Sequence, residues 1–88
     1  MTAQRKRVVF TFEAPDANNV FLAGSFNNWS TNADPMKKNS EGVWTKAKIL
    51  QKGVHEYKFI VDNKWILDPS CQNTSTNADG TVNSVITI

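Results

Sequence analysis

Five side chains in this sequence have the types and the placing that carbohydrate recognition requires. An indole stacks on the C–H-rich face of a pyranose ring, while Lys, Asn and Thr side chains hydrogen-bond the hydroxyls on its edge. Trp29 closes a polar run, Ser25–Asn28, that follows the short apolar segment Val20–Ala23. A tryptophan flanked by Asn and Ser is poorly placed for a core, so we expect it to face a ligand. The candidate binding residues are Trp29, Trp65, Lys58, Asn83 and Thr81.

Four of the five candidates also have a plainer interpretation that the sequence leaves open. Trp29 could anchor its own loop, and Trp65 could pack across a strand pair against Ile60. Lys58 could be an ordinary solvated strand residue, and Asn83 could cap a turn. Binding requires that the two tryptophans lie exposed on one surface, whereas packing would bury them apart.

Residues 54–62 give the clearest strand pattern, and the turn that follows fixes a register. Asp62-Asn63 reads as a two-residue hairpin turn, because both residue types tolerate positive φ. The register that this turn implies pairs Val61 with Lys64, Ile60 with Trp65, and Phe59 with Ile66. Directly paired residues share a face of the sheet, so we expect Trp65 beside Lys58 on the outer face and Phe59 in the core.

Other segments alternate as β-strands do, and polar turns separate them. In the third strand the cleaner apolar face comprises Val43, Thr45, Ala47 and Ile49. This face leaves out Trp44, which we still expect to be packed, and a β-bulge near Thr45 would allow both. No segment shows a sustained helical period, so the sequence predicts an all-β sandwich. The other expected strands are 7–13, 20–24, 43–50 and 81–88, with long loops at 25–42 and 70–80.

Composition argues against several classes of partner. The net charge of +2 is too small to imply a polyanion, and Arg5-Lys6-Arg7 reads as a solvated terminus because the other basic residues are scattered among acids. Cys71 is the only cysteine, which favours a reducing, cytoplasmic setting, with a plastid as the alternative. No apolar run is long enough for a membrane span. We expect residues 1–7 to be a flexible basic segment and residues 8–88 to form one domain.

Catalysis has little support in the sequence. His55 and Cys71 are the only residues of their types, so neither a zinc site nor a Cys/His pair has enough members. Two carboxylates could flank a glycosidic bond, but Glu56 and Asp62 would lie on an open face that does not exclude water. The sequence predicts a non-catalytic domain that needs no cofactor and no metal.

Four motifs follow one another along the chain. They are Val20–Trp29 (VFLAGSFNNW), Tyr57–Asp62 followed by Trp65, Asp68-Pro69, and Gly80–Asn83. In order and spacing these motifs resemble the glycogen-binding domain of the AMP-activated protein kinase β subunit, a member of carbohydrate-binding module family 48. The resemblance covers residues 8–88 and implies an immunoglobulin-like β-sandwich of antiparallel strands that binds α-1,4-linked glucan without catalysis.

The resemblance also implies roles for the candidate residues. Trp29 and Trp65 match two tryptophans that stack on glucose units. Lys58 and Asn83 match residues that bond sugar hydroxyls, and Thr81 matches a neighbouring contact. These implied roles agree with the chemistry expected from the residue types alone.

Three features depart from the family pattern. Asp79 stands where the family usually has a leucine that projects into the curve of the glucan, and a carboxylate cannot make that apolar contact. Asn63 replaces the usual turn glycine, a minor change because Asn tolerates positive φ. The Arg5-Lys6-Arg7 segment has no counterpart in the family. Because of Asp79, we expect the affinity for glucan, or the preference among glucans, to differ from that of the family.

The expected function is binding of α-1,4-glucan, as glycogen, starch or maltooligosaccharide, by a module that targets other domains or subunits of a larger protein to polysaccharide. An alternative keeps the fold but not the sugar, with the outer face contacting protein and Asp79 as a sign of weakened glucan binding. Neither interpretation includes a nucleic-acid or membrane partner.

Overall fold

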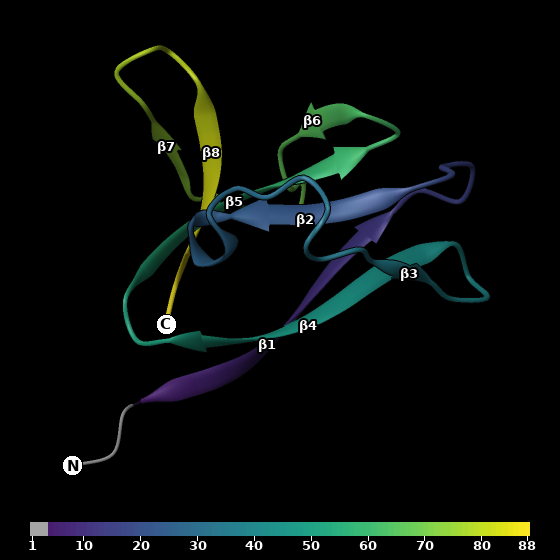
Figure 1. The fold of residues 1–88 in the computed structure, drawn as a ribbon, viewed down its shortest axis with the longest axis horizontal. Coiled ribbons are helices and arrows are strands. Elements are labelled where there is room, and N and C mark those ends of the chain that lie inside the picture. The colour runs from purple at the N-terminus through teal and green to yellow at the C-terminus, as the bar shows by residue number, and fades with distance from the viewer. Residues whose placement is uncertain (1–3) are drawn as a thin grey trace.

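Residues 4–88 are described by a computed structural model, in which two antiparallel sheets pack face to face (Figure 1). The sheets form the all-β antiparallel sandwich that the sequence predicts. One sheet, in the order β1–β4–β3, comprises β1 (Arg5–Glu13), β4 (Val43–Gln51) and β3 (Lys37–Lys38). The other, in the order β2–β5–β8–β7 with β6 also paired to β5, comprises β2 (Val20–Gly24), β5 (Val54–Val61), β6 (Lys64–Ile66), β7 (Thr74–Thr76) and β8 (Val82–Thr87).

Aromatic rings from both sheets meet in the core. Phe10 on β1 lies edge-on to Tyr57 on β5, with ring centroids 4.8 Å apart. Phe12 on β1 lies 5.0 Å from Phe59 on β5. The prediction that Phe59 enters the core is confirmed, because its side chain is fully buried. These contacts between the sheets hold the second sheet with its opposite face toward solvent.

The predicted register of the β5–β6 hairpin is confirmed in full. Its pairs are Val61 with Lys64, Ile60 with Trp65, and Phe59 with Ile66. Both turn residues have positive φ, 48° at Asp62 and 71° at Asn63, as a two-residue turn of this kind requires. The hairpin therefore places Trp65 on the outer face of the second sheet.

The inner face of β4 is the opposite of the one predicted. Trp44 and Leu50 are buried, whereas Ile49 is 66% exposed on the outer side. The pairing of β4 with β1 keeps one register over the whole length of both strands, so the bulge expected near Thr45 does not form. The expectation that Trp44 is packed is confirmed, but a regular strand achieves it.

Two lysines explain why the apolar pattern of β4 was misleading. Lys46 and Lys48 share the inner face with Trp44, and their amines lie 3.8 and 3.2 Å from a carboxylate oxygen of Asp34. Asp34 is buried at 6% exposure and attracts both amines, which remain partly exposed, so the inner face tolerates residues that look like surface residues in the sequence.

Short elements interrupt both predicted loops. The segment 25–42 contains the 3₁₀ turn η1 (Ser25–Asn27) and strand β3, and the segment 70–80 contains β7. Strand β1 begins at Arg5, so the Arg5–Arg7 part of the expected flexible segment is instead paired with β4. Residues 1–3 of that segment lie outside the described residues. Within residues 4–88, no helix is long and apolar enough to cross a membrane.

Candidate functional site

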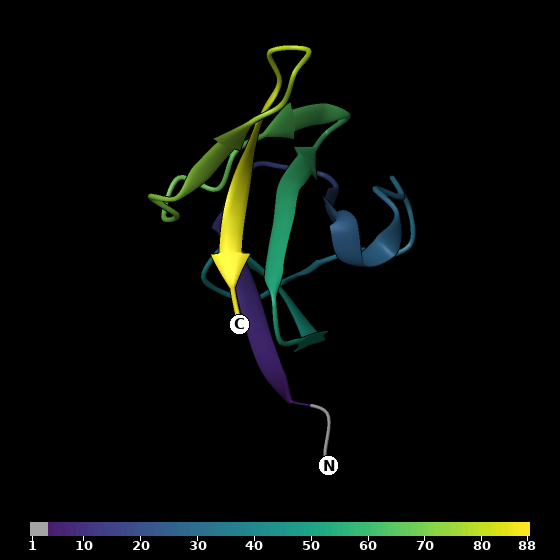
Figure 2. The same ribbon diagram turned by 90° about the vertical axis from the view of Figure 1, so that its left-hand side faces the viewer.

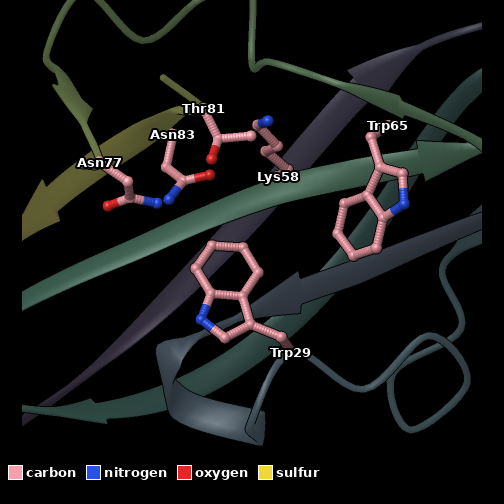
Figure 3. A pocket seen from close by; sticks show the side chains of 6 residues that line it. All are labelled: Trp29, Lys58, Trp65, Asn77, Thr81 and Asn83. Carbon is pink, nitrogen blue, oxygen red and sulfur yellow. The ribbon is translucent and has the colours of Figure 1, made fainter. Parts of the chain in front are cut away.

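The candidate residues meet on the outer face of the second sheet, at a fork beside β5. Strand β8 pairs with β5 as far as Tyr57, and β6 pairs with the same edge from Phe59 onward, so Lys58 lies where the two partners separate. Figure 2 shows β8 running beside β5, with β6 at its far end. An open hollow of about 480 Å³ occupies this fork (Figure 3), lined by Trp29, Lys58, Trp65, Asn77, Thr81 and Asn83. All five residues predicted from the sequence are among these six.

Two indoles form the apolar side of the hollow. The ring centroids of Trp29 and Trp65 are 6.4 Å apart, and their planes are inclined by 49°. Trp65 is 47% exposed, and Trp29 is half-buried. Trp65 also pairs with Ile60, which is 5% exposed on the same face of the sheet. The two tryptophans thus lie together on one surface and are not buried apart.

A tightly bonded loop brings Trp29 to the hollow. After η1, Asn28 and Trp29 both adopt left-handed backbone, with φ values of 57° and 58°. Left-handed backbone costs a residue such as tryptophan about 1–3 kcal/mol, so hydrogen bonds around Trp29 must stabilise this conformation. The N–H of Trp29 donates to the carbonyl of Gly24 at 2.9 Å. The side chain of Asn27 accepts from the N–H of Gly24 and donates to the carbonyl of Leu22, both at 3.0 Å.

Asp34 ties this loop to the first sheet. Its Oδ2 accepts a hydrogen bond from Nδ2 of Asn27 at 2.7 Å, and its Oδ1 accepts one from Nζ of Lys48 at 3.2 Å. Burial alone would raise the pKa of Asp34, but these hydrogen bonds and the charges of Lys48 and Lys46 hold that pKa below its ordinary value. The carboxylate is therefore ionised at neutral pH, and it links Asn27 in the loop to Lys48 on β4.

The polar side of the hollow is held by carboxylates. Nδ2 of Asn83 donates to Oε1 of Glu56 at 3.0 Å, and Asn83 is 5% exposed. The backbone N–H of Thr81 donates to Oδ1 of Asp79 at 3.0 Å, and the Thr81 hydroxyl donates to the same oxygen. These two Thr81 bonds, with a contribution from the charge of Lys58, lower the pKa of Asp79.

The fold and this cluster of side chains agree with a comparison against known families. A family model described as the glycogen recognition site of AMP-activated protein kinase matches residues 6–88. The chain belongs to this family. The match covers both tryptophans and the whole polar side of the hollow.

Curated relatives of this family member include kinase subunits and a phosphatase. The chain is 38% identical over 84 residues to 5'-AMP-activated protein kinase subunit beta-2 of Mus musculus, covering 96% of the chain and 30% of that protein. It is 38% identical over 87 residues to subunit beta-1 of Sus scrofa, covering 99% of the chain and 67% of that protein. It is 32% identical over 89 residues to an amyloplastic phosphoglucan phosphatase of Castanea sativa, covering 100% of the chain and 24% of that protein. The chain thus spans less than a third of the mouse and chestnut proteins.

Asn77 lines the hollow of this glycogen-recognition module although the sequence analysis did not single it out. Its N–H donates to the carbonyl of Thr81 at 2.8 Å, and its carbonyl accepts from the N–H of Gly80 at 3.0 Å, which closes the β7–β8 hairpin. The only sequence signal for this hairpin is the turn-forming segment 77–80 between two threonine-containing segments. The hairpin carries Asn77 and Thr81 to the rim of the hollow together.

Proposed function

We propose that this chain binds α-1,4-linked glucan, such as glycogen, starch or maltooligosaccharide, in the hollow between Trp29 and Trp65. The observation that carries the proposal is the pair of indoles, 6.4 Å apart and inclined by 49°. An α-1,4-glucan curves, so adjacent glucose rings present their C–H-rich faces at an angle to each other. Two inclined indoles suit that curve better than two coplanar ones would, and each would stack on one glucose unit.

Polar side chains beside the indoles would hold the hydroxyl edges of the sugar. The ammonium group of Lys58 can donate hydrogen bonds, and Asn83 and Thr81 can accept them. All three line the same hollow as the tryptophans. This division into an apolar side and a polar side matches the two chemical faces of a pyranose ring.

The module is proposed to bind without catalysing a reaction. The six residues that line the hollow include no Asp, Glu, His or Cys. Within residues 4–88, no group of three or more such side chains is placed to hold a metal ion. A hollow that is open to solvent also lacks the burial that raises the pKa of a catalytic acid. The chemistry that this surface offers to a ligand is stacking by the indoles and hydrogen bonding by Lys58, Asn83 and Thr81.

The expected affinity is modest. Each aromatic contact contributes about 0.5–1.5 kcal/mol beyond its buried area, and association costs several kcal/mol against this. Dissociation constants between about 1 µM and 1 mM are expected for short oligosaccharides. Firm attachment to a polysaccharide granule would then come from many glucan ends or several modules. We propose that the module targets other domains or subunits of a larger protein to polysaccharide.

Calorimetric titration with maltoheptaose, and with cellohexaose as the β-linked control, tests this proposal. Maltoheptaose should bind with a dissociation constant below about 1 mM, and cellohexaose, whose chain is straight, should bind far more weakly. If maltoheptaose does not bind at millimolar concentration, the proposal is wrong and a protein-docking role for the same face becomes the better account.

A further inference from the structure

Two carboxylates hold the polar side of the hollow without lining it. Glu56 on β5 accepts a hydrogen bond from Nδ2 of Asn83, and Asp79 in the β7–β8 hairpin accepts two from Thr81. Neither carboxylate belongs to the lining of the hollow. Glu56 therefore affects the hollow by orienting Asn83, and Asp79 affects it by orienting Thr81.

Glu56 fixes the orientation of the Asn83 amide. A side-chain amide has a donor end and an acceptor end of similar size, so its neighbours decide which end points where. An ionised carboxylate only accepts hydrogen bonds, and so it draws the NH₂ group toward itself. The carbonyl oxygen of Asn83 is then turned the other way, toward Thr81 and Lys58 in Figure 3. At 5% exposure, Asn83 has little room to reverse.

Asp79 does the same for Thr81. A hydroxyl has a single proton, and the Thr81 proton is committed to Oδ1 of Asp79. The Thr81 oxygen therefore offers only lone pairs to a ligand. Among the six lining residues Lys58 is the one cation. It lies two positions from Glu56 on the same face of β5, and its charge contributes to the lowered pKa of Asp79.

We propose that Glu56 and Asp79 are positioning residues that make Asn83 and Thr81 present hydrogen-bond acceptors to the hollow, beside the ammonium group of Lys58, and that the hollow thereby selects neutral glucan over phosphorylated glucan. The inference rests on the proposed function. A sugar hydroxyl can donate to such acceptors. A phosphate group at that place would offer mainly acceptor oxygens and a charge of about −1.5 to −2. A hollow with one ammonium group and two carboxylates behind its polar side is a poor phosphate site, because such sites gather several cationic donors.

Matched variants separate the effect of the hydrogen bond that each carboxylate accepts from the effect of its negative charge. Glu56→Gln and Asp79→Asn remove a charge but keep an oxygen that accepts the bond, whereas Glu56→Ala and Asp79→Ala remove both. For neutral maltotriose, followed by NMR chemical-shift titration, the amide variants should stay within about twofold of wild type. The alanine variants should bind about three- to tenfold more weakly, because the lining side chain is freed. Equal affinity of the alanine and amide variants would overturn the positioning role.

The effect of the Glu56 and Asp79 charges on selectivity is tested by comparing the affinity for maltotriose with that for maltotriose that carries a 6-phosphate on its central glucose. Wild type should prefer the neutral sugar by at least about tenfold, and the double variant E56Q/D79N should narrow that preference by about two- to fivefold for each charge removed. Glu41→Gln, which removes one charge on the β3–β4 turn, should leave the preference unchanged. Equal or tighter binding of the phosphorylated sugar by wild type, or an unchanged preference in the double variant, would overturn the inference. If wild type binds neither sugar, it is the proposed function that fails.

Discussion

The ammonium group of Lys48, on the inner face of β4, lies 3.2 Å from a carboxylate oxygen of Asp34, in the segment that follows Trp29. The same carboxylate accepts a hydrogen bond from the side chain of Asn27. That side chain also accepts one from the N–H of Gly24, the residue whose carbonyl accepts from the N–H of Trp29. A chain of polar contacts therefore connects the first sheet to the loop that carries Trp29 on the second. The stability of the sandwich and the position of Trp29 are expected to change together.

The ionised Asp34 should stabilise the fold in a pH-dependent way. Its folded pKa is below the ordinary value, so its contribution is present above that ordinary value, about 3.9, and is lost as the pH falls through the folded pKa. Asp34→Asn should lower the free energy of unfolding by about 1–3 kcal/mol at pH 7. Urea unfolding of both proteins at pH 7 and pH 3 checks this. The difference should shrink at pH 3, and a difference that does not change with pH would contradict the ion-pair role.

Asn27 should support binding without touching the glucan. Asn27→Ala removes hydrogen bonds to Gly24, Leu22 and Asp34, and should cost about 1–3 kcal/mol of stability. It should also weaken maltoheptaose binding several-fold, because Trp29 loses its support. The matched control is Asn28→Gly, since glycine adopts the positive φ of this position readily. That variant should change stability by less than about 0.5 kcal/mol. Unaltered binding by Asn27→Ala at a temperature where it is folded would contradict the prediction.

The tryptophans should separate into binding and folding residues. Trp65→Ala should weaken maltoheptaose binding by at least about tenfold and cost less than about 1 kcal/mol of stability, because the side chain is 47% exposed. Trp29→Ala should weaken binding to a similar extent. Trp44→Ala should instead cost about 3–5 kcal/mol, because that ring is buried and its Nε1–H donates to the carbonyl of Ala14 at 2.8 Å. Calorimetric titration and urea unfolding of each variant give the two quantities, and a Trp65→Ala protein that binds normally would be the contrary result.

Gly24 should resist substitution for lack of space. Its φ of −169° is open to any residue, but a Cβ atom there would lie 2.6 Å from the carbonyl oxygen of Glu56 and 2.7 Å from the ring of Phe26. Gly24→Ala should therefore push the Trp29 loop away from β5 and cost about 1–3 kcal/mol. The free energy of unfolding and the affinity for maltoheptaose should both fall. If neither falls, the contact between this loop and β5 is not as close as described.

Local patterns were sufficient to predict the β5–β6 hairpin and part of the site. A two-residue turn allows one register, and the register decides which residues share a face. Trp65 and Lys58 could therefore be placed on one outer face before the structure was known, and the structure confirms it. The resemblance to a family added the expectation that Trp29 lies over that same face.

Other features depend on contacts between distant segments and have no local pattern. The inner face of β4 was misjudged because its lysines lie beside Asp34, which reaches them only in the folded chain. The same carboxylate helps to place Trp29, whose loop contains no periodic signal. Asn77 and the holding roles of Glu56 and Asp79 became visible once the β7–β8 hairpin was placed beside β5.

The most direct test of the central claim follows the indole N–H signals of all three tryptophans by NMR while maltoheptaose is added. If Trp29 and Trp65 bind one glucan, their signals should shift together and give the same dissociation constant. The signal of Trp44, whose indole N–H is bonded to Ala14 inside the sandwich, should stay in place and serve as the internal control. Shifts at only one of the two site tryptophans, different dissociation constants for the two, or no shift at millimolar sugar would contradict the account.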